Sequence, residues 1–178
     1  MEEKPRSVSV NALWYGLIAG AGMIVYSLIL FLLDQHTNRY LGLLGLLVLA
    51  GVMVWGTIDY RNKYLGGYMA YGKAFVSCFL IGLVATIISI VYFYFFVTLI
   101  HPGFLNEMTD LTREQLINQY PDWSDEQIEQ MMNSQSFMMK PAVMTIFGLI
   151  QYLIISAVMA LIAAIFIKKE DKSLNTST

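Results

Sequence analysis

Four long apolar runs without a charged side chain constrain this chain more than any other feature. They cover residues 11–33, 41–58, 74–100 and 142–167 and contain no Asp, Glu, Lys, Arg or His. Each run meets or approaches the roughly 20 residues that a helix needs to cross a bilayer. A helix on the surface of a soluble domain would instead carry a polar stripe. The runs therefore predict an all-α, polytopic membrane protein with four transmembrane helices, whose backbone polar groups are satisfied within each helix.

The composition favours a single membrane domain over residues 1–178. The chain is 57% hydrophobic and only 13% charged, which is too apolar for a typical soluble domain. We expect the four helices to form an antiparallel bundle, with residues 101–141 as a small helical extracytoplasmic cap between the third and fourth. Cys78, the single cysteine, lies inside the third run. An intrachain disulfide and a cysteine-based metal framework are therefore excluded.

Basic residues are segregated between the loops. Eight of the eleven lie before the first run, between the second and third, or after the fourth: Lys4, Arg6, Arg61, Lys63, Lys73, Lys168, Lys169 and Lys172. The positive-inside rule places these segments in the cytoplasm. We therefore expect both termini inside and residues 101–141 outside. The first run is longer than the apolar region of a signal peptide, and no small-x-small cleavage site follows it, so we expect it to be retained.

The segment 101–141 carries signals for two short helices. It contains seven acidic and two basic residues, and both Thr112–Gln115 and Ser124–Gln127 match a capping box. Pro121 separates the two predicted helices. In the second, apolar residues recur at helical spacing and include Met131, Met132, Met138 and Met139. This pattern predicts an amphipathic helix that packs on the outer ends of the third and fourth spans or lies at the membrane–water interface.

Small and polar residues inside the runs suggest helix contacts. Gly16 and Gly20 lie four residues apart on one face, which indicates either a homodimer interface or close packing within the chain; we favour packing within the chain. Gln151 has the most polar side chain in any span. Its amide would contact a substrate or hydrogen-bond to a neighbouring helix, and we favour the interhelical bond.

No motif indicates catalysis, a cofactor or a metal. The chain lacks the His-Glu-x-x-His, Gly-x-Ser-x-Gly and phosphate-loop patterns, so we expect no enzymatic activity. Loop methionines near His101 would suit Cu(I), but their helical spacing favours a packing face, and we predict no metal site. His101 and Pro102 stand at the outer end of the third span, where His101 is expected as an interfacial polar residue rather than a general base.

Several ordered motifs carry a family resemblance. They include Tyr15–Gly20, the pentapeptide Tyr71-Gly72-Lys73-Ala74-Phe75, and Ile100–Phe104. With these motifs the chain resembles the family known as domain of unknown function 4199, four-helix membrane proteins found mainly in Bacteroidota. The resemblance covers nearly the whole chain. It implies the inner membrane of a Gram-negative cell, with residues 101–141 in the periplasm, and it implies no activity or ligand.

These observations favour a non-enzymatic scaffold, accessory subunit or envelope-homeostasis factor. The alternative is a small transporter or lipid-handling protein with a groove at the aromatic outer half of the third span, residues 92–96. Lys73, between Gly72 and the span residue Phe75, would contact a lipid phosphate or serve as a topology signal, and we favour the topology signal. Expected partners are membrane lipid and either a second copy of the chain or another membrane protein, and not nucleic acid.

Overall fold

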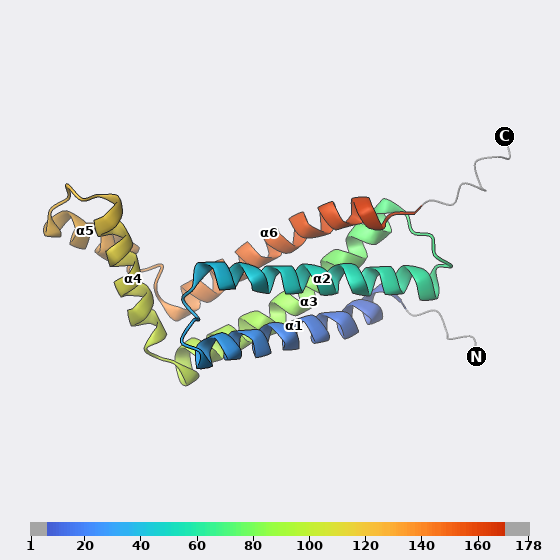
Figure 1. Cartoon of the computed structure of the whole chain (residues 1–178), viewed down its shortest axis with the longest axis horizontal. Coiled ribbons are helices and arrows are strands. Elements are labelled where there is room, and N and C mark those ends of the chain that lie inside the picture. The colour runs from blue at the N-terminus through green and yellow to red at the C-terminus, as the bar shows by residue number, and fades with distance from the viewer. Residues whose placement is uncertain (1–6, 170–178) are drawn as a thin grey trace. The chain divides into compact units, whose positions relative to one another are not determined.

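The computed structural model describes residues 7–169, apart from the side chain of Arg39. Its elements are α1 (Val8–Leu32), α2 (Arg39–Tyr64), α3 (Tyr71–Phe95), the π-helix η1 (Phe96–Ile100), α4 (Phe104–Gln119), α5 (Asp125–Gln135) and α6 (Pro141–Ile167) (Figure 1). The described residues contain no strand, and one isolated β-bridge pairs Met69 with Lys169. The predicted all-α class is confirmed. Lys4, Arg6 and Lys172 lie outside the described residues.

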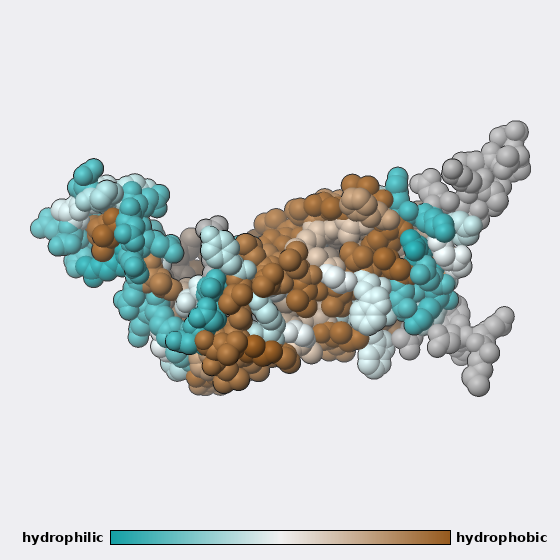
Figure 2. Space-filling view, viewed as in Figure 1, coloured by the Kyte–Doolittle hydropathy of each residue, from teal (hydrophilic) through white to brown (hydrophobic). Residues whose placement is uncertain are grey.

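Four of the helices are long and apolar enough to cross a membrane: α1, α2, α6, and α3 continued by η1. Their outer faces carry large apolar side chains, including Leu17, Leu47, Ile154 and Phe166, which is 81% exposed. Figure 2 shows apolar side chains over these helices, whereas polar side chains cover α4 and α5. Such a surface on helices of this length is typical of contact with lipid. The chain is therefore a multi-pass membrane protein, and the four predicted spans are confirmed.

Local side chains explain where the first helices begin. The Ser7 hydroxyl accepts a hydrogen bond from the backbone N–H of Val10 at 3.3 Å and caps α1. Asn38 caps α2 by accepting from the N–H groups of Tyr40 and Leu41. Both side chains satisfy donors that the first helical turn leaves without a partner.

The segment between α2 and α3 depends on two glycines. Gly66 and Gly67 both have positive φ, at 61° and 87°. L side chains rarely adopt this conformation, so glycine permits the chain to reverse here.

The chain divides into two compact units, and α3 and α6 contribute residues to both. The first unit contains the chain up to Ser89 and from Gln151 onward. Its core is formed by side chains from all four long helices, many of them small: Ala12, Ala19, Leu49, Met53, Tyr60, Ala74, Cys78, Ile81, Ala85, Ala160, Ala164 and Ile167. Hydrogen bonds join Asn11 to Gly56 and Tyr26 to Leu41. This order of contacts makes α1 and α2 antiparallel neighbours (Figure 1).

The second unit spans Ile90–Ile150 and holds η1, α4 and α5. Its buried apolar side chains are Phe96, Val97, Leu116 and Ile128. The Thr109 hydroxyl donates to the Met139 sulfur at 3.1 Å, which ties α4 to the segment after α5. Arg113 and Glu129 form an exposed ion pair at 3.8 Å between α4 and α5.

Only one of the two predicted capping boxes begins a helix. Ser124 and Gln127 form the complete reciprocal pair at the start of α5, as predicted. The prediction for Thr112 was wrong, because α4 begins at Phe104 and Thr112 lies inside it, donating to the Met108 carbonyl at 2.7 Å. The second helix also ends at Gln135, so Met138 and Met139 follow α5 rather than belonging to it.

Candidate functional site

The first unit holds a buried cluster of hydroxyl and thiol groups between the last turns of α2 and the first turns of α3. The Thr57 hydroxyl on α2 lies 3.2 Å from both the Ser77 Oγ and the Cys78 Sγ on α3. The Cys78 thiol in turn approaches the Met53 carbonyl at 3.6 Å. A hydroxyl has one hydrogen, so Thr57 donates to one partner at a time. The cluster thus joins α2 and α3 through exchangeable hydrogen bonds.

A second set of polar contacts joins α1 to α2. The buried Asn11 amide donates to the Gly56 carbonyl at 3.0 Å, and the Tyr15 hydroxyl donates to the Asp59 carboxylate at 2.8 Å. Lys63, one helical turn further along α2, approaches the same carboxylate at 3.0 Å. Asp59 is therefore paired on two sides.

Basic side chains gather where α2 ends, α3 begins and α6 ends. We call the group Arg61, Lys63, Lys73, Lys168 and Lys169 the basic rim. Arg61 donates to the Ile167 carbonyl at 2.8 Å, and Met69 and Lys169 exchange backbone hydrogen bonds of 2.8 and 2.9 Å. The Lys169 ammonium also lies 5.7 Å from the centre of the Tyr68 ring. These contacts hold the end of α6 against the segment between α2 and α3.

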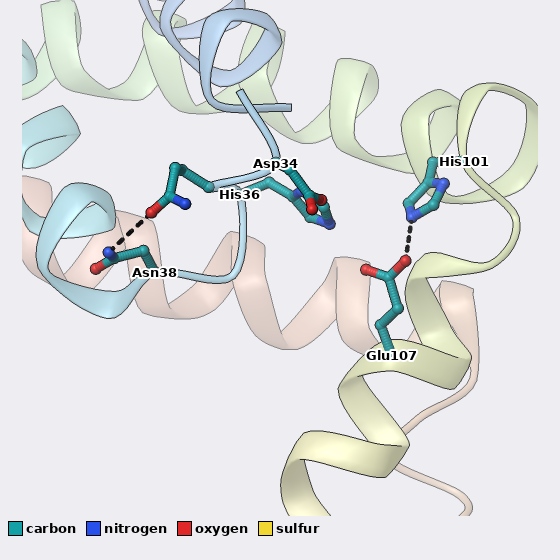
Figure 3. A network of polar contacts seen from close by, with 6 residues as sticks. Asp34, His36, Asn38, His101 and Glu107 are labelled. Atoms are coloured by element: carbon teal, nitrogen blue, oxygen red, sulfur yellow. Dashed lines mark hydrogen bonds and ion pairs between the residues drawn. The ribbon is translucent and has the colours of Figure 1, made fainter. Parts of the chain in front are cut away.

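The second unit contains a histidine–carboxylate pair. His101 follows η1, and its Nε2 lies 2.8 Å from a carboxylate oxygen of Glu107 on α4 (Figure 3). The rings of Phe96 and Phe104 lie near the imidazole, with centroids at 6.0 and 6.4 Å. Neighbouring Pro102 is exposed. The pair fixes the direction in which the chain leaves η1 and enters α4.

Close backbone approach explains two of the sequence-predicted positions. A Cβ at Gly16 would lie 2.5 Å from the Val84 Cβ, and one at Gly20 would lie 2.9 Å from the Ile88 Cβ. Both distances are below those that real Cβ atoms reach. The two glycines therefore face α3 of the same chain, which is the contact within the chain that we favoured.

The sequence profile described as protein of unknown function (DUF4199) matches residues 14–169. The chain belongs to this family. No match was found among curated proteins, and none among solved structures.

The residues at the start of α3 that carry the family resemblance differ in exposure. Gly72 and Lys73 are exposed, and a Cβ on Gly72 would meet open space. Phe75 is partly buried and stacks on Phe79 with ring centres 5.9 Å apart. Gln151 is exposed on α6, and within residues 7–169 its amide makes no hydrogen bond to another helix. The structure thus brings Lys73 into the basic rim but gives Gln151 no interhelical partner.

Three residues of these contacts were not singled out from the sequence: Asn11, Thr57 and Asp59. Asp59 had a detectable signal, because Asp59 and Lys63 have the i,i+4 spacing of a helical ion pair. Asn11 and Thr57 had no such sequence signal, because their hydrogen-bond partners lie 45 and 20 positions away along the chain.

Proposed function

We propose that this DUF4199 protein is a non-enzymatic inner-membrane scaffold, accessory subunit or envelope-homeostasis factor. The observation that carries the proposal is the use of buried polar side chains to join helices. Thr57 bonds across to α3, and Asn11 bonds to the backbone of α2. Polar groups that bond to neighbouring helices stabilise a fixed bundle rather than solvate a substrate.

The distribution of charge supports an orientation. Eight of the eleven basic residues fall on segments that the positive-inside rule assigns to the cytoplasm. Both termini are then cytoplasmic, and residues 101–141 are periplasmic. Acidic residues carry little weight in this rule, so the acidic character of 101–141 is a separate property.

The acidic surface of the second unit supports a protein partner. Six of its seven acidic residues are exposed: Asp110, Glu114, Asp122, Asp125, Glu126 and Glu129. The exposed basic residues in the same segment are Arg113 and Lys140. A surface with such an excess of one sign favours encounter with a partner of the opposite sign.

Aromatic packing in the second unit favours a scaffold over a lipid groove. Phe93 and Phe96 contact the Phe104 ring edge-to-face, with centroids 6.0 and 5.9 Å apart. Edge-to-face pairs of this kind stabilise packing beyond the area that they bury. The Phe93 ring near the end of α3 and the Phe96 ring at the start of η1 thus hold the start of α4.

Site-specific photocrosslinking in living cells tests the proposal. A photoreactive phenylalanine analogue is placed at Asn118, which is exposed on α4, and at Ile154, which is exposed on the apolar face of α6. We expect a discrete protein adduct from position 118, to another protein or to a second copy of the chain, and lipid adducts from position 154. Lipid adducts alone from both positions would contradict the scaffold proposal.

A charge variant sharpens this experiment. Glu114→Gln and Glu126→Gln remove two exposed acidic groups from α4 and α5 without shortening a side chain. The adduct at position 118 should weaken, because electrostatic complementarity raises the association rate. An undiminished adduct would show that the partner does not recognise acidic charge.

A further inference from the structure

Among residues 7–169, basic side chains outnumber acidic ones at the basic rim, and Glu170 and Asp171, which follow Lys169 in the sequence, lie outside the described residues. The rim has five basic side chains. The one acidic residue at this end of the first unit, among the described residues, is Asp59, and it already pairs with Lys63 and Tyr15. Arg61 is engaged with the Ile167 carbonyl. Lys73, Lys168 and Lys169 form no ion pair with another residue of 7–169, and all three are exposed.

Backbone contacts hold these three lysines near one another. The two hydrogen bonds between Met69 and Lys169 place the end of α6 beside the segment that leads into α3. The Tyr71 hydroxyl also donates to the Leu161 carbonyl at 3.3 Å, a second contact between the start of α3 and α6. Lys73 is therefore held on the same end of the unit as Lys168 and Lys169, although 95 or more positions separate them along the chain.

Apolar and aromatic surface adjoins the lysines. Phe166 is 81% exposed, two positions before Lys168, and Val76 is exposed three positions after Lys73. Tyr68 and Tyr71 are also exposed beside the bridge. Lysines next to an apolar surface and interfacial tyrosines match a phospholipid, whose charged phosphate lies beside its acyl chains.

We propose that the basic rim binds the headgroup of an anionic phospholipid, with acyl chains covering the apolar surface around Phe166 and Val76. Lys73 and Lys168 supply charge to the phosphate. The Met69–Lys169 bridge holds the end of α6 beside the segment that leads to Lys73. This site stands independently of the scaffold function and of any protein partner.

Lipid titration of the purified full-length chain in neutral detergent tests the site. Native mass spectrometry measures the binding of phosphatidylglycerol and of phosphatidylcholine, and thermal unfolding measures the stabilisation by each lipid. We expect phosphatidylglycerol to bind more tightly, and Lys73→Gln with Lys168→Gln to weaken its binding about 25-fold, since each lysine near an anionic lipid surface contributes about fivefold. Phosphatidylcholine binding should change little.

A charge-matched variant provides the control. Arg113→Gln with Lys140→Gln also removes two positive charges, from exposed positions in the second unit, and should leave phosphatidylglycerol binding unchanged. Equal losses in the two double variants, or no loss in the rim variant, would overturn the proposal.

If the rim variant does not fold, the single variant Lys168→Gln replaces it, with an expected loss of about fivefold. Full displacement of phosphatidylglycerol by inorganic phosphate would also overturn it, because the rim would then be a site for free anions.

Discussion

Gly16 allows a close approach between two helices that no other side chain would permit. An added Cβ would lie 2.5 Å from the Val84 Cβ and 3.1 Å from the Ile81 carbonyl oxygen, and the carbonyl belongs to backbone that cannot rotate away. Gly16→Ala should therefore lower the free energy of unfolding by about 1–3 kcal/mol. Gly22, on the same helix, has open space at its Cβ position and provides the control. Unfolding in mixed detergent micelles should separate the two variants; equal stability would contradict the assigned contact.

Two buried threonines of the first unit differ in what their hydroxyls do. Thr57 bonds to Ser77 and Cys78, whereas the Thr86 Oγ1 is buried without a hydrogen-bond partner. Valine keeps the shape of threonine and removes the hydroxyl. Thr57→Val should destabilise the protein by roughly 1 kcal/mol, in the range of interhelical hydrogen bonds in membranes. Thr86→Val should be neutral or stabilising, because it removes an unsatisfied polar atom. The same micelle unfolding assay checks both, and a larger loss for Thr86→Val would contradict this account.

At the scale of the elements, a cap has an effect only where it begins a helix. Ser124 accepts from the Gln127 N–H and is completed by the Gln127 side chain, so Ser124→Ala should destabilise α5 by about 1 kcal/mol. Thr112→Ala should not destabilise α4, because Thr112 lies within that helix and alanine has the higher helix propensity. Hydrogen exchange followed by mass spectrometry gives the result for each helix. Faster exchange of α4 in the Thr112 variant would show that the hydroxyl supports the helix.

The same elements show how far the sequence determined the structure. The four spans could be predicted because a charge-free run of that length has few stable alternatives. The start of α4 could not, since the pattern at Thr112–Gln115 is also compatible with a helix interior. The end of α2 extended beyond the apolar run, to Tyr64, where Asp59 and Lys63 pair across one helical turn. The basic rim depends on the Met69–Lys169 bridge, and contacts between such distant positions leave no local pattern in the sequence.

At the scale of the whole molecule, the proposed orientation makes a prediction for Asn62 and Gln119. Both residues are exposed, Asn62 near the end of α2 and Gln119 at the end of α4. Each is replaced by cysteine in a Cys78→Ser background. The Cys78 side chain is fully buried, and serine preserves a polar contact for Thr57, so this background should fold. Positive-inside orientation places position 62 in the cytoplasm and position 119 in the periplasm.

A membrane-impermeant maleimide, added to cells whose outer membrane has been permeabilised, distinguishes the two sides. Position 119 should label in intact cells, and position 62 only after the inner membrane is lysed. Labelling after lysis is the control, because it proves that the thiol at position 62 is reactive and that the inner membrane alone had protected it. The opposite pattern would invert the topology, move the acidic α4 and α5 surface to the cytoplasm, and place the basic rim on the periplasmic side. The rim would still bind anionic lipid in detergent, so its chemistry and its orientation are tested separately.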